Sequence, residues 1–289
     1  MCFFRSRERR QPHGRDVQSR LFSTVASGLS VVLVAASASG AFAAELANHR
    51  AAYDLKLSAA ESSADIAGLS GRMVLEWTGN SCDGYTLGQR LVTQLSDTDG
   101  GVMVRDLRMS SWESGDGDQF RFEVQRYAGA QLDETVSGFA DRSGTSSAAT
   151  FSQPSDVVLD LPDDIIFPSE FVQDLVETAA SGKSLMSASV FEGAETDHYF
   201  LVSSFIGKPS NVATDTVSQV GEGMDLAGAS SWPVQVSYFL PHEQEGIPDY
   251  QVSYRLFENG VSSNMRLDYG DIVIDGTLTD LTYLVPDPC

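Results

Sequence analysis

A stretch from Gly71 to Leu95 constrains the fold more than any other part of the chain. Its first half alternates apolar and polar residues with a period of two, which predicts a half-buried strand. Turn-forming residues follow between Gly79 and Gly84, and a second alternating run begins at Tyr85. The stretch therefore predicts two paired strands, and the turn that joins them contains Cys82.

The N-terminus has the order of a secretory signal peptide. Six arginines precede an apolar segment, Val25–Ala38, which is followed by the small-residue motif Ala41-Phe42-Ala43. A transmembrane anchor is the alternative, but the apolar segment is short for the roughly 20 residues that span a bilayer. We predict that residues 1–44 are cleaved and that the mature chain, 45–289, has no membrane span and is exported.

The cysteine count predicts one disulfide. Of the three cysteines, Cys2 would leave with the signal peptide, so that Cys82 and the last residue, Cys289, remain. An even count in an exported chain is typical of a disulfide. Two free thiols are the alternative, and a reactive thiol is less favoured because the chain has no C-x-x-C motif.

The charge of the chain excludes one class of partner. The full chain has a formal net charge of −21, and without residues 1–44 it would hold 13 basic and 38 acidic residues. Such an acidic protein repels phosphate backbones, so we expect no nucleic-acid partner. Anionic lipid headgroups are disfavoured for the same reason.

Most of the mature chain has the pattern of short strands. Alternating runs separated by Gly and Asp turns predict about fourteen strands, from His49–Ala60 to a last run ending at Val285. Asn259-Gly260 is the strongest hairpin signal. We predict one all-β domain over 45–289, in which a large curved antiparallel sheet forms a broken barrel.

One amphipathic helix is expected after Pro168. Ser169 is a suitable N-cap, and Phe171, Leu175 and Ala179 fall on one apolar stripe. Gly182 is suited to the C-terminal cap. The adjoining Ser181–Ser184 resembles the end of a phosphate-binding loop, but here it would close a helix rather than open one, so we expect no nucleotide site.

No catalytic or metal motif stands out. His49, His198 and His242 are far apart in sequence, and no run carries the full ligand series of a zinc or calcium site. A G-x-S-x-G nucleophile motif is absent. We expect no cofactor and no metal. The tryptophans Trp77, Trp112 and Trp232 are interpreted as core or inner-wall residues, with an apolar ligand groove as the alternative.

An ordered set of short motifs resembles the EipB family, the periplasmic cell-envelope-integrity proteins of alphaproteobacteria. The matching pieces are His49-x-x-x-Tyr53-x-Leu55, Glu76-Trp77, Cys82-Asp83-Gly84-Tyr85, Gln89-Arg90, Phe167-Pro168-Ser169, Val190-Phe191-Glu192-Gly193, Tyr238-Phe239, Pro248-x-Tyr250, Asn259-Gly260-Val261, Asp268-Tyr269-Gly270 and the final Cys289. Together they span nearly the whole mature chain.

The resemblance implies a spiral-like broken barrel wrapped around the helix, with Cys82 and Cys289 joined. It implies structural roles for the motif residues Trp77, Gly84, Tyr85, Arg90, Pro168, Tyr238, Asn259, Gly260 and Tyr269. Two positions depart from the family: Tyr85 where a Trp is expected, and Phe171 where a His is expected.

For function, the resemblance implies a role in keeping the envelope intact under stress, with no established enzymatic reaction. On this basis we expect a non-enzymatic, monomeric protein of the periplasm. We expect it to bind another envelope component, protein, peptide or lipid, through the concave side of its sheet. A lipid or lipoprotein carrier is the alternative, and a cell-wall hydrolase is a more distant one.

Overall fold

The computed structural model describes residues 46–211, 226, 228–241, 246–285 and 289, which belong to one compact unit, Phe42–Cys289. The predicted signal peptide, residues 1–44, lies outside the described residues. The strands in chain order are β1 (His49–Ala60), β2 (Ile66–Asn80), β3 (Gly84–Asp97), β4 (Val102–Glu113), β5 (Gln119–Ala128), β6 (Gln131–Asp141), β7 (Ser147–Gln153), β8 (Val158–Leu161), β9 (Ile165–Ile166), β10 (Leu185–Val190), β11 (Phe200–Ile206), β12 (Ser210–Asn211), β13 (Ser230–Phe239), β14 (Tyr250–Phe257), β15 (Ser262–Asp268) and β16 (Ile272–Tyr283). A short 3-10 turn, η1 (Ser62–Ala64), joins β1 to β2, and the helix is α1 (Pro168–Ala180).

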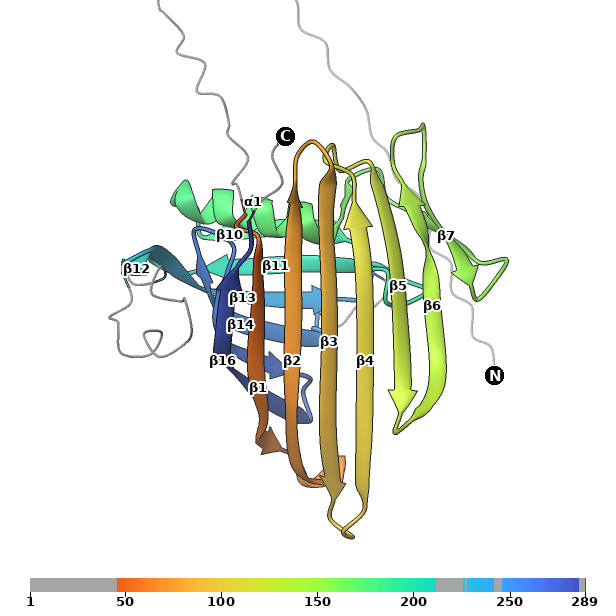
Figure 1. The fold of residues 1–289 in the computed structure, drawn as a ribbon, viewed down its shortest axis with the longest axis vertical. Helices are drawn as coiled ribbons and strands as arrows, with labels where there is room; N and C mark the ends of the chain where they lie inside the picture. Colours follow the sequence, from red (N-terminus) through yellow and green to blue (C-terminus); the bar gives the residue numbers. More distant parts are fainter. Residues whose placement is uncertain (1–45, 212–225, 227, 242–245, 286–288) are drawn as a thin grey trace, which may run out of the picture. The chain divides into compact units, whose positions relative to one another are not determined.

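All sixteen strands of the described residues belong to one sheet. Its order is β8-β7-β6-β5-β4-β3-β2-β1-β16-β15-β14-β13-β11-β10-β9, and β12 pairs with β13 off this path. Neighbours are antiparallel except β9, which is parallel to β10. The first strand pairs with the last, β1 with β16, so the chain returns to its start within the sheet. The two ends of the path, β8 and β9, are consecutive in sequence, so the curled sheet ends almost where it begins. In Figure 1 the strands β1–β6 run along the long axis, and β11 crosses behind them.

This architecture confirms the predicted all-β broken barrel of roughly fourteen strands around one helix, and the described residues form sixteen strands whose limits differ in places from those predicted. The expected runs at 271–275 and 277–285 form one continuous strand, β16. Three strands were missed, namely β8, β9 and β12, with four, two and two residues. Runs this short carry too few residues to display a period of two. Strand β13 also begins earlier than predicted, at Ser230 instead of Pro233.

In the β2–β3 hairpin, the pairing register places the alternating apolar residues of the two strands opposite one another. Met73 pairs with Leu91 and Trp77 with Leu87, so the apolar residues of both strands share the inner face. Trp77 is buried and stacks on Tyr85, with 5.6 Å between ring centroids. Burial of one face sets the register, because a slip by one residue would turn every apolar side chain outward.

Helix α1 begins two residues earlier than predicted. Its N-cap is Phe167, which makes no side-chain capping bond, and Pro168 occupies the first turn. Ser169 is therefore not the N-cap, and its backbone N–H donates to the side chain of Glu113 at the end of β4. At the other end Gly182 has φ +77°, and its N–H bonds the carbonyl of Ala179. This αL cap ends the helix at the Ser181–Ser184 segment, as predicted.

Three apolar clusters fill the inside of the sheet. One packs α1, through Phe171, Leu175 and Ala179, against β10, β11 and β13. A second lies between β1, β2, β15 and β16, and a third joins β5–β7 to β9 and to the end of β10. Phe171, one of the two departures from the family pattern, is thus a core residue of the first cluster. The concave side around α1 is occupied by side chains, so the expected concave binding surface is not supported there.

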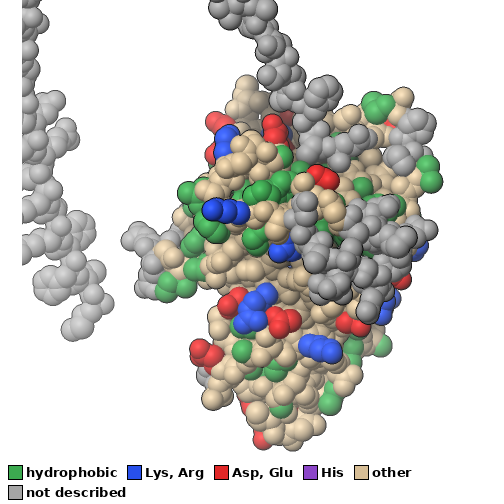
Figure 2. Space-filling view, turned by 90° about the vertical axis from the view of Figure 1, so that its left-hand side faces the viewer, with side chains coloured by type: hydrophobic (Ala, Val, Ile, Leu, Met, Phe, Trp, Pro, Cys, Tyr) green, Lys and Arg blue, Asp and Glu red, His purple; other side chains and the backbone are tan. Residues whose placement is uncertain are grey.

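One expected inner-wall residue lies on the outside. Trp112 is partly exposed and alternates with the inward-facing Ser111 and Glu113, and its Nε1 donates to the Asp83 carbonyl. Trp77 and Trp232 are buried as predicted. On the face shown in Figure 2, acidic and basic side chains lie beside one another rather than in a field of one sign.

Gly84 offers a test of how the hairpin meets β4. It has φ +88°, and a Cβ there would overlap the carbonyl oxygen of Glu113. We expect Gly84→Ala to lower the free energy of unfolding by about 2 kcal/mol or more, measured by urea denaturation. Gly88→Ala in the same strand is the matched control, because a Cβ there meets nothing within 4 Å. Equal losses in the two variants would contradict this interpretation.

Candidate binding site beside the helix

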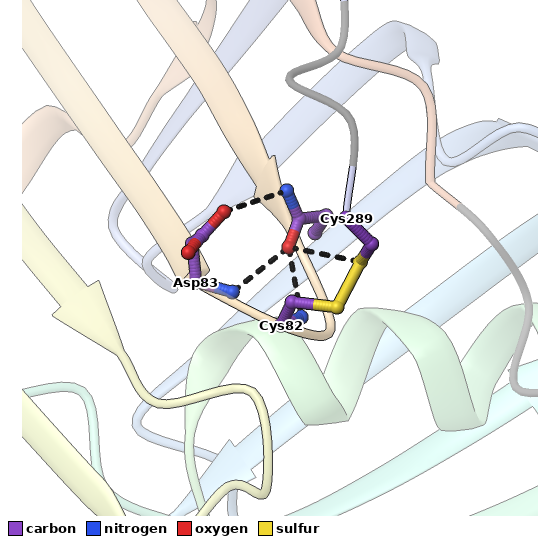
Figure 3. The surroundings of a disulfide bond; sticks show 4 residues. Cys82, Asp83 and Cys289 are labelled. Carbon is purple, nitrogen blue, oxygen red and sulfur yellow. Dashed lines mark hydrogen bonds between the residues drawn. A yellow bond between two sulfur atoms is a disulfide. The ribbon is translucent and has the colours of Figure 1, made fainter.

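A disulfide ties the end of the chain to the β2–β3 turn. Cys82 and Cys289 are bonded with 5.7 Å between their Cα atoms, across a separation of 207 residues (Figure 3). Inside the turn, Asn80 Oδ1 accepts hydrogen bonds from the backbone N–H groups of Cys82 and Asp83, each at 2.8 Å. The turn is therefore held both covalently and by its own side chain.

The loop after β4 packs closely on this turn. A Cβ on Gly115 would overlap the backbone carbonyl of Ser81, so only glycine fits at this contact. The same loop and the last residue of β4, Glu113, lie beside the start of α1. Together with Tyr85 they line a pocket of about 230 Å³ whose other wall is formed by Ser169, Glu170, Gln173 and Asp174.

Glu113 supplies the missing cap of α1. It is 2% exposed, and its Oε1 accepts a hydrogen bond of 2.6 Å from the backbone N–H of Ser169. A helix N-terminus has unpaired N–H groups and a partial positive charge, so a carboxylate there is stabilising. Burial raises the pKa of Glu113 to about 7, although the hydrogen bonds from Ser169 act in the opposite direction.

Arg142 completes the junction. It follows β6 and donates to the carbonyl of Ile165 in β9 and, at 2.6 Å, to the carboxylate of Glu170 in the first turn of α1. Its guanidinium also lies 5.5 Å from the ring centroid of Phe167. The side chain of Arg142 therefore connects the end of strand β6, strand β9 and the helix.

A second pocket lies along the other side of α1. It has a volume of about 460 Å³ and is open to solvent between the C-terminal half of the helix and strands β9 and β10. Its lining residues are Asp164, Ile166, Asp174, Glu177, Thr178, Ser181, Lys183, Met186, Ser187 and Ala188. We call this pocket the α1–β10 groove. Asp174 lines both pockets, so the exposed side of α1 is a ridge between them.

The α1–β10 groove is acidic. Its lining includes three carboxylates, those of Asp164, Asp174 and Glu177, and one ammonium group, that of Lys183. Burial raises the pKa of Asp174, the neighbouring Glu177 raises it further, and the charge of Arg142 opposes both. The direction of this shift means that the ionised form of Asp174 is less favoured in the groove than in water, mainly because the carboxyl group is partly buried.

A further buried carboxylate lies among aromatic rings. Glu192, just after β10, accepts a hydrogen bond of 3.2 Å from the hydroxyl of Tyr250. Desolvation raises its pKa to about 7. Tyr250 stacks on Tyr238 with 4.3 Å between centroids, and Tyr269 lies 5.8 Å from Tyr250. Tyr238 belongs to β13, Tyr250 to β14, and Tyr269 directly follows β15, so the fold brings together around one carboxylate three rings that are distant in sequence.

The other motif residues have separate places. Arg90 lies on the outer face of β3 and shares Asp106 with Arg108, at 2.8 and 2.9 Å. Asn259 donates from Nδ2 to the hydroxyl of Tyr283, and Gly260 has φ +83° in the predicted hairpin. These contacts serve local structure.

The sequence did not identify the polar residues that define this site. Glu113, Arg142 and Asp174 stand in ordinary polar patterns, and no spacing marks them as a group. Within the part of the chain that the structure describes, no group of three or more His, Cys, Asp or Glu residues could hold a metal ion. A helix long and apolar enough to cross a membrane is likewise absent from the described residues.

Comparison with known proteins agrees with the fold. Residues 40–285 match the family described as EipB-like. The chain is 32% identical over 264 residues to the cell envelope integrity protein EipB of Brucella abortus (strain 2308), covering 90% of this chain and 93% of that protein. It also resembles the crystal structure of a β-barrel-like protein of a domain of unknown function from Brucella abortus. That similarity has a TM-score of 0.79 and 31% identity, and it covers 84% of this chain and all of the other.

The disulfide should contribute to stability only under oxidising conditions. Under reducing conditions, a variant that lacks Cys82 should be as stable as the unchanged protein. We expect Cys82→Ser to lower the free energy of unfolding by about 2–4 kcal/mol under oxidising conditions, because the long loop is no longer closed in the unfolded chain. Urea denaturation with and without a reductant measures this. A similar loss in both conditions would mean that Cys82 acts through packing.

Glu113 should make stability depend on pH. Its pKa rises from 4.5 to about 7 on folding, so the folded chain binds this proton more tightly than the unfolded chain. The protonated Glu113 therefore stabilises the folded chain fully below pH 4.5, and this stabilisation is lost as the pH rises through 7. The free energy of unfolding should fall by about 3 kcal/mol at most over this range. Urea denaturation between pH 4.5 and 8 should therefore give a flatter profile for Glu113→Gln. The exposed Glu123→Gln is the control, and an unchanged slope in Glu113→Gln would contradict the prediction.

Proposed function

The chain belongs to the EipB-like family, and on this basis we propose that it supports cell-envelope integrity from the periplasm. In this proposal it is a non-enzymatic protein that binds another envelope component. The role in envelope integrity follows the name of the Brucella relative. The binding function rests on the α1–β10 groove.

The observation that supports binding is an open groove between two rigid elements. Both ends of α1 are fixed, the first by Glu113 and Arg142 and the last by the αL cap at Gly182. The buried face of α1 packs on the core, and β10 is paired with β11 along its whole length. A groove with walls of this kind needs little ordering when a ligand binds, which favours affinity.

The two carboxylates with strongly raised pKa values have structural partners. Glu113 is almost fully buried and caps α1, and Glu192 accepts from Tyr250 among aromatic rings. A general acid or base must reach the proton that it transfers on a substrate. Engagement of both groups inside the protein therefore favours the non-enzymatic function.

Two features support the periplasmic location. The N-terminal residues have the order of a signal peptide, and the bond between Cys82 and Cys289 is of a kind that persists in oxidising compartments. The family membership is consistent with both.

Complementation in cells tests the function. In a strain that lacks the gene, we expect the Asp174→Lys/Glu177→Lys double variant to fail to restore growth on detergent and EDTA, because it reverses the charge of the groove. The control, Glu123→Lys/Asp160→Lys, makes the same change in net charge at exposed positions on β5 and β8. It should restore growth as the unchanged protein does.

Equal thermal stability of the two double variants is required for the comparison, and circular dichroism of the purified proteins measures it. Restoration by both variants would mean that the groove is not the binding surface. Co-purification of a stoichiometric lipid with the unchanged protein, detected by native mass spectrometry, would instead support a carrier.

A further inference from the structure

One edge of strand β10 is open beside the groove. β10 pairs with β11 over all six of its residues, from Leu185–Phe205 to Val190–Phe200. On its other side it pairs with β9 only at Ser189 and Val190. Over Leu185–Ala188, no strand among the described residues occupies that side of β10.

The backbone groups that point to the open edge can be identified. The N–H of Phe191 donates to Ile166 on the β9 side, whereas the carbonyl of Ser184 accepts from Ile206 on the β11 side. Successive residues of a strand direct their backbone groups to opposite sides. The backbone N–H and C=O groups of the odd-numbered residues of β10 therefore point to the open edge. At Leu185 and Ser187 these groups have no partner strand among the described residues. Both residues are solvent-exposed.

The groove gives this edge room for one more strand. It has a volume of about 460 Å³ and lies between the edge and α1, which runs alongside β10 in Figure 1. Four residues of an extended strand would be about 13 Å long. The added strand would lie end to end with β9, which occupies the same line beside Ser189 and Val190.

The residues that line the α1–β10 groove indicate which side chains an added strand should carry. On the side of α1, Asp174 and Glu177 offer negative charge, and Asp164 lies at the β9 end. Ile166, Met186 and Ala188 provide partly buried apolar contacts at the same pocket. Lysine or arginine side chains facing α1 would complement the charge, while an acidic segment would be repelled.

We propose that the α1–β10 groove binds a basic, extended segment of another protein by β-strand addition to Leu185–Ala188. This inference rests on the proposed binding function and specifies its partner. The backbone of the segment would bond Leu185 and Ser187, and its basic side chains would lie near Asp174 and Glu177. Strand addition to an exposed edge is a general mode of peptide recognition, with the backbone supplying affinity and side chains supplying specificity.

A synthetic peptide tests the proposal directly. The probe is acetyl-Lys-Val-Lys-Thr-Lys-Val-amide, added to the mature, oxidised protein at low salt. Amide hydrogen exchange followed by NMR should slow by about tenfold or more at Leu185 and Ser187 when the peptide saturates the protein. The amides of Met186 and Ala188 already face β11 and should change little.

N-methylated peptides separate strand addition from charge attraction. One isomer carries N-methyl groups at residues 1, 3 and 5 of the peptide, and the other carries them at 2, 4 and 6. In an added strand only one set of amides faces β10, so we expect one isomer to bind about tenfold or more weakly than the other. Isothermal titration calorimetry measures both. Equal affinities of the isomers would overturn strand addition.

Charge variants test the basic character of the partner. Asp174→Asn/Glu177→Gln should weaken the binding of the probe and reduce its salt dependence, whereas Glu123→Gln/Asp160→Asn should leave both unchanged. A peptide with Glu in place of Lys should not bind. If the lysine probe fails to bind, or binds without protecting Leu185 and Ser187, the inference is wrong. The proposed function would still stand if the Asp174→Lys/Glu177→Lys variant failed to complement in cells.

Discussion

Side-chain packing across the gap between the two ends of the sheet holds the barrel together. In the described residues the ladder of backbone hydrogen bonds runs from β8 to β9 without closing. A group of phenylalanines joins the two sides instead, with ring centroids 5.0 Å apart for Phe120 and Phe167 and 5.4 Å apart for Phe122 and Phe191. Arg126 adds a hydrogen bond from β5 to the carbonyl of Ala194 beyond β10. A twisted sheet of sixteen strands tends to curl, and this contact holds its two edges together without a backbone ladder between them.

Helix α1 packs against the inner face of the broken barrel, on β10, β11 and β13. Its apolar face completes the core, and its polar N-terminus must then be satisfied inside the protein. Glu113 and Arg142 do so from β4 and from the end of β6, so the cap of the helix comes from residues that are distant in sequence. The stability of α1 therefore depends on the sheet, and the disulfide at Cys82 holds the neighbouring hairpin turn in place.

A consequence of this arrangement is that one side of α1 faces a strand that lacks a partner. β9 is only two residues long, so it covers the end of β10 and leaves the rest of that edge beside the acidic side of the helix. Natural sheets commonly protect their edges with charges or short strands, because an open edge recruits other chains. Here the charges are those of Asp174 and Glu177 on the facing helix, and in our proposal they select a basic partner.

Local patterns in the sequence determined the long strands, the Asn259-Gly260 hairpin and the glycine cap at the end of α1, because each depends on residues close in the chain. The cysteine count indicated the pair that the structure joins. Only the tertiary structure decided the short strands β8, β9 and β12, the outward position of Trp112, and the capping of Ser169 by Glu113. A two-residue strand is set by its neighbours, and a carboxylate becomes a helix cap only when a distant strand delivers it to the N-terminus. The groove beside α1 likewise exists because the fold places a helix and an incomplete sheet edge together, which no local pattern encodes.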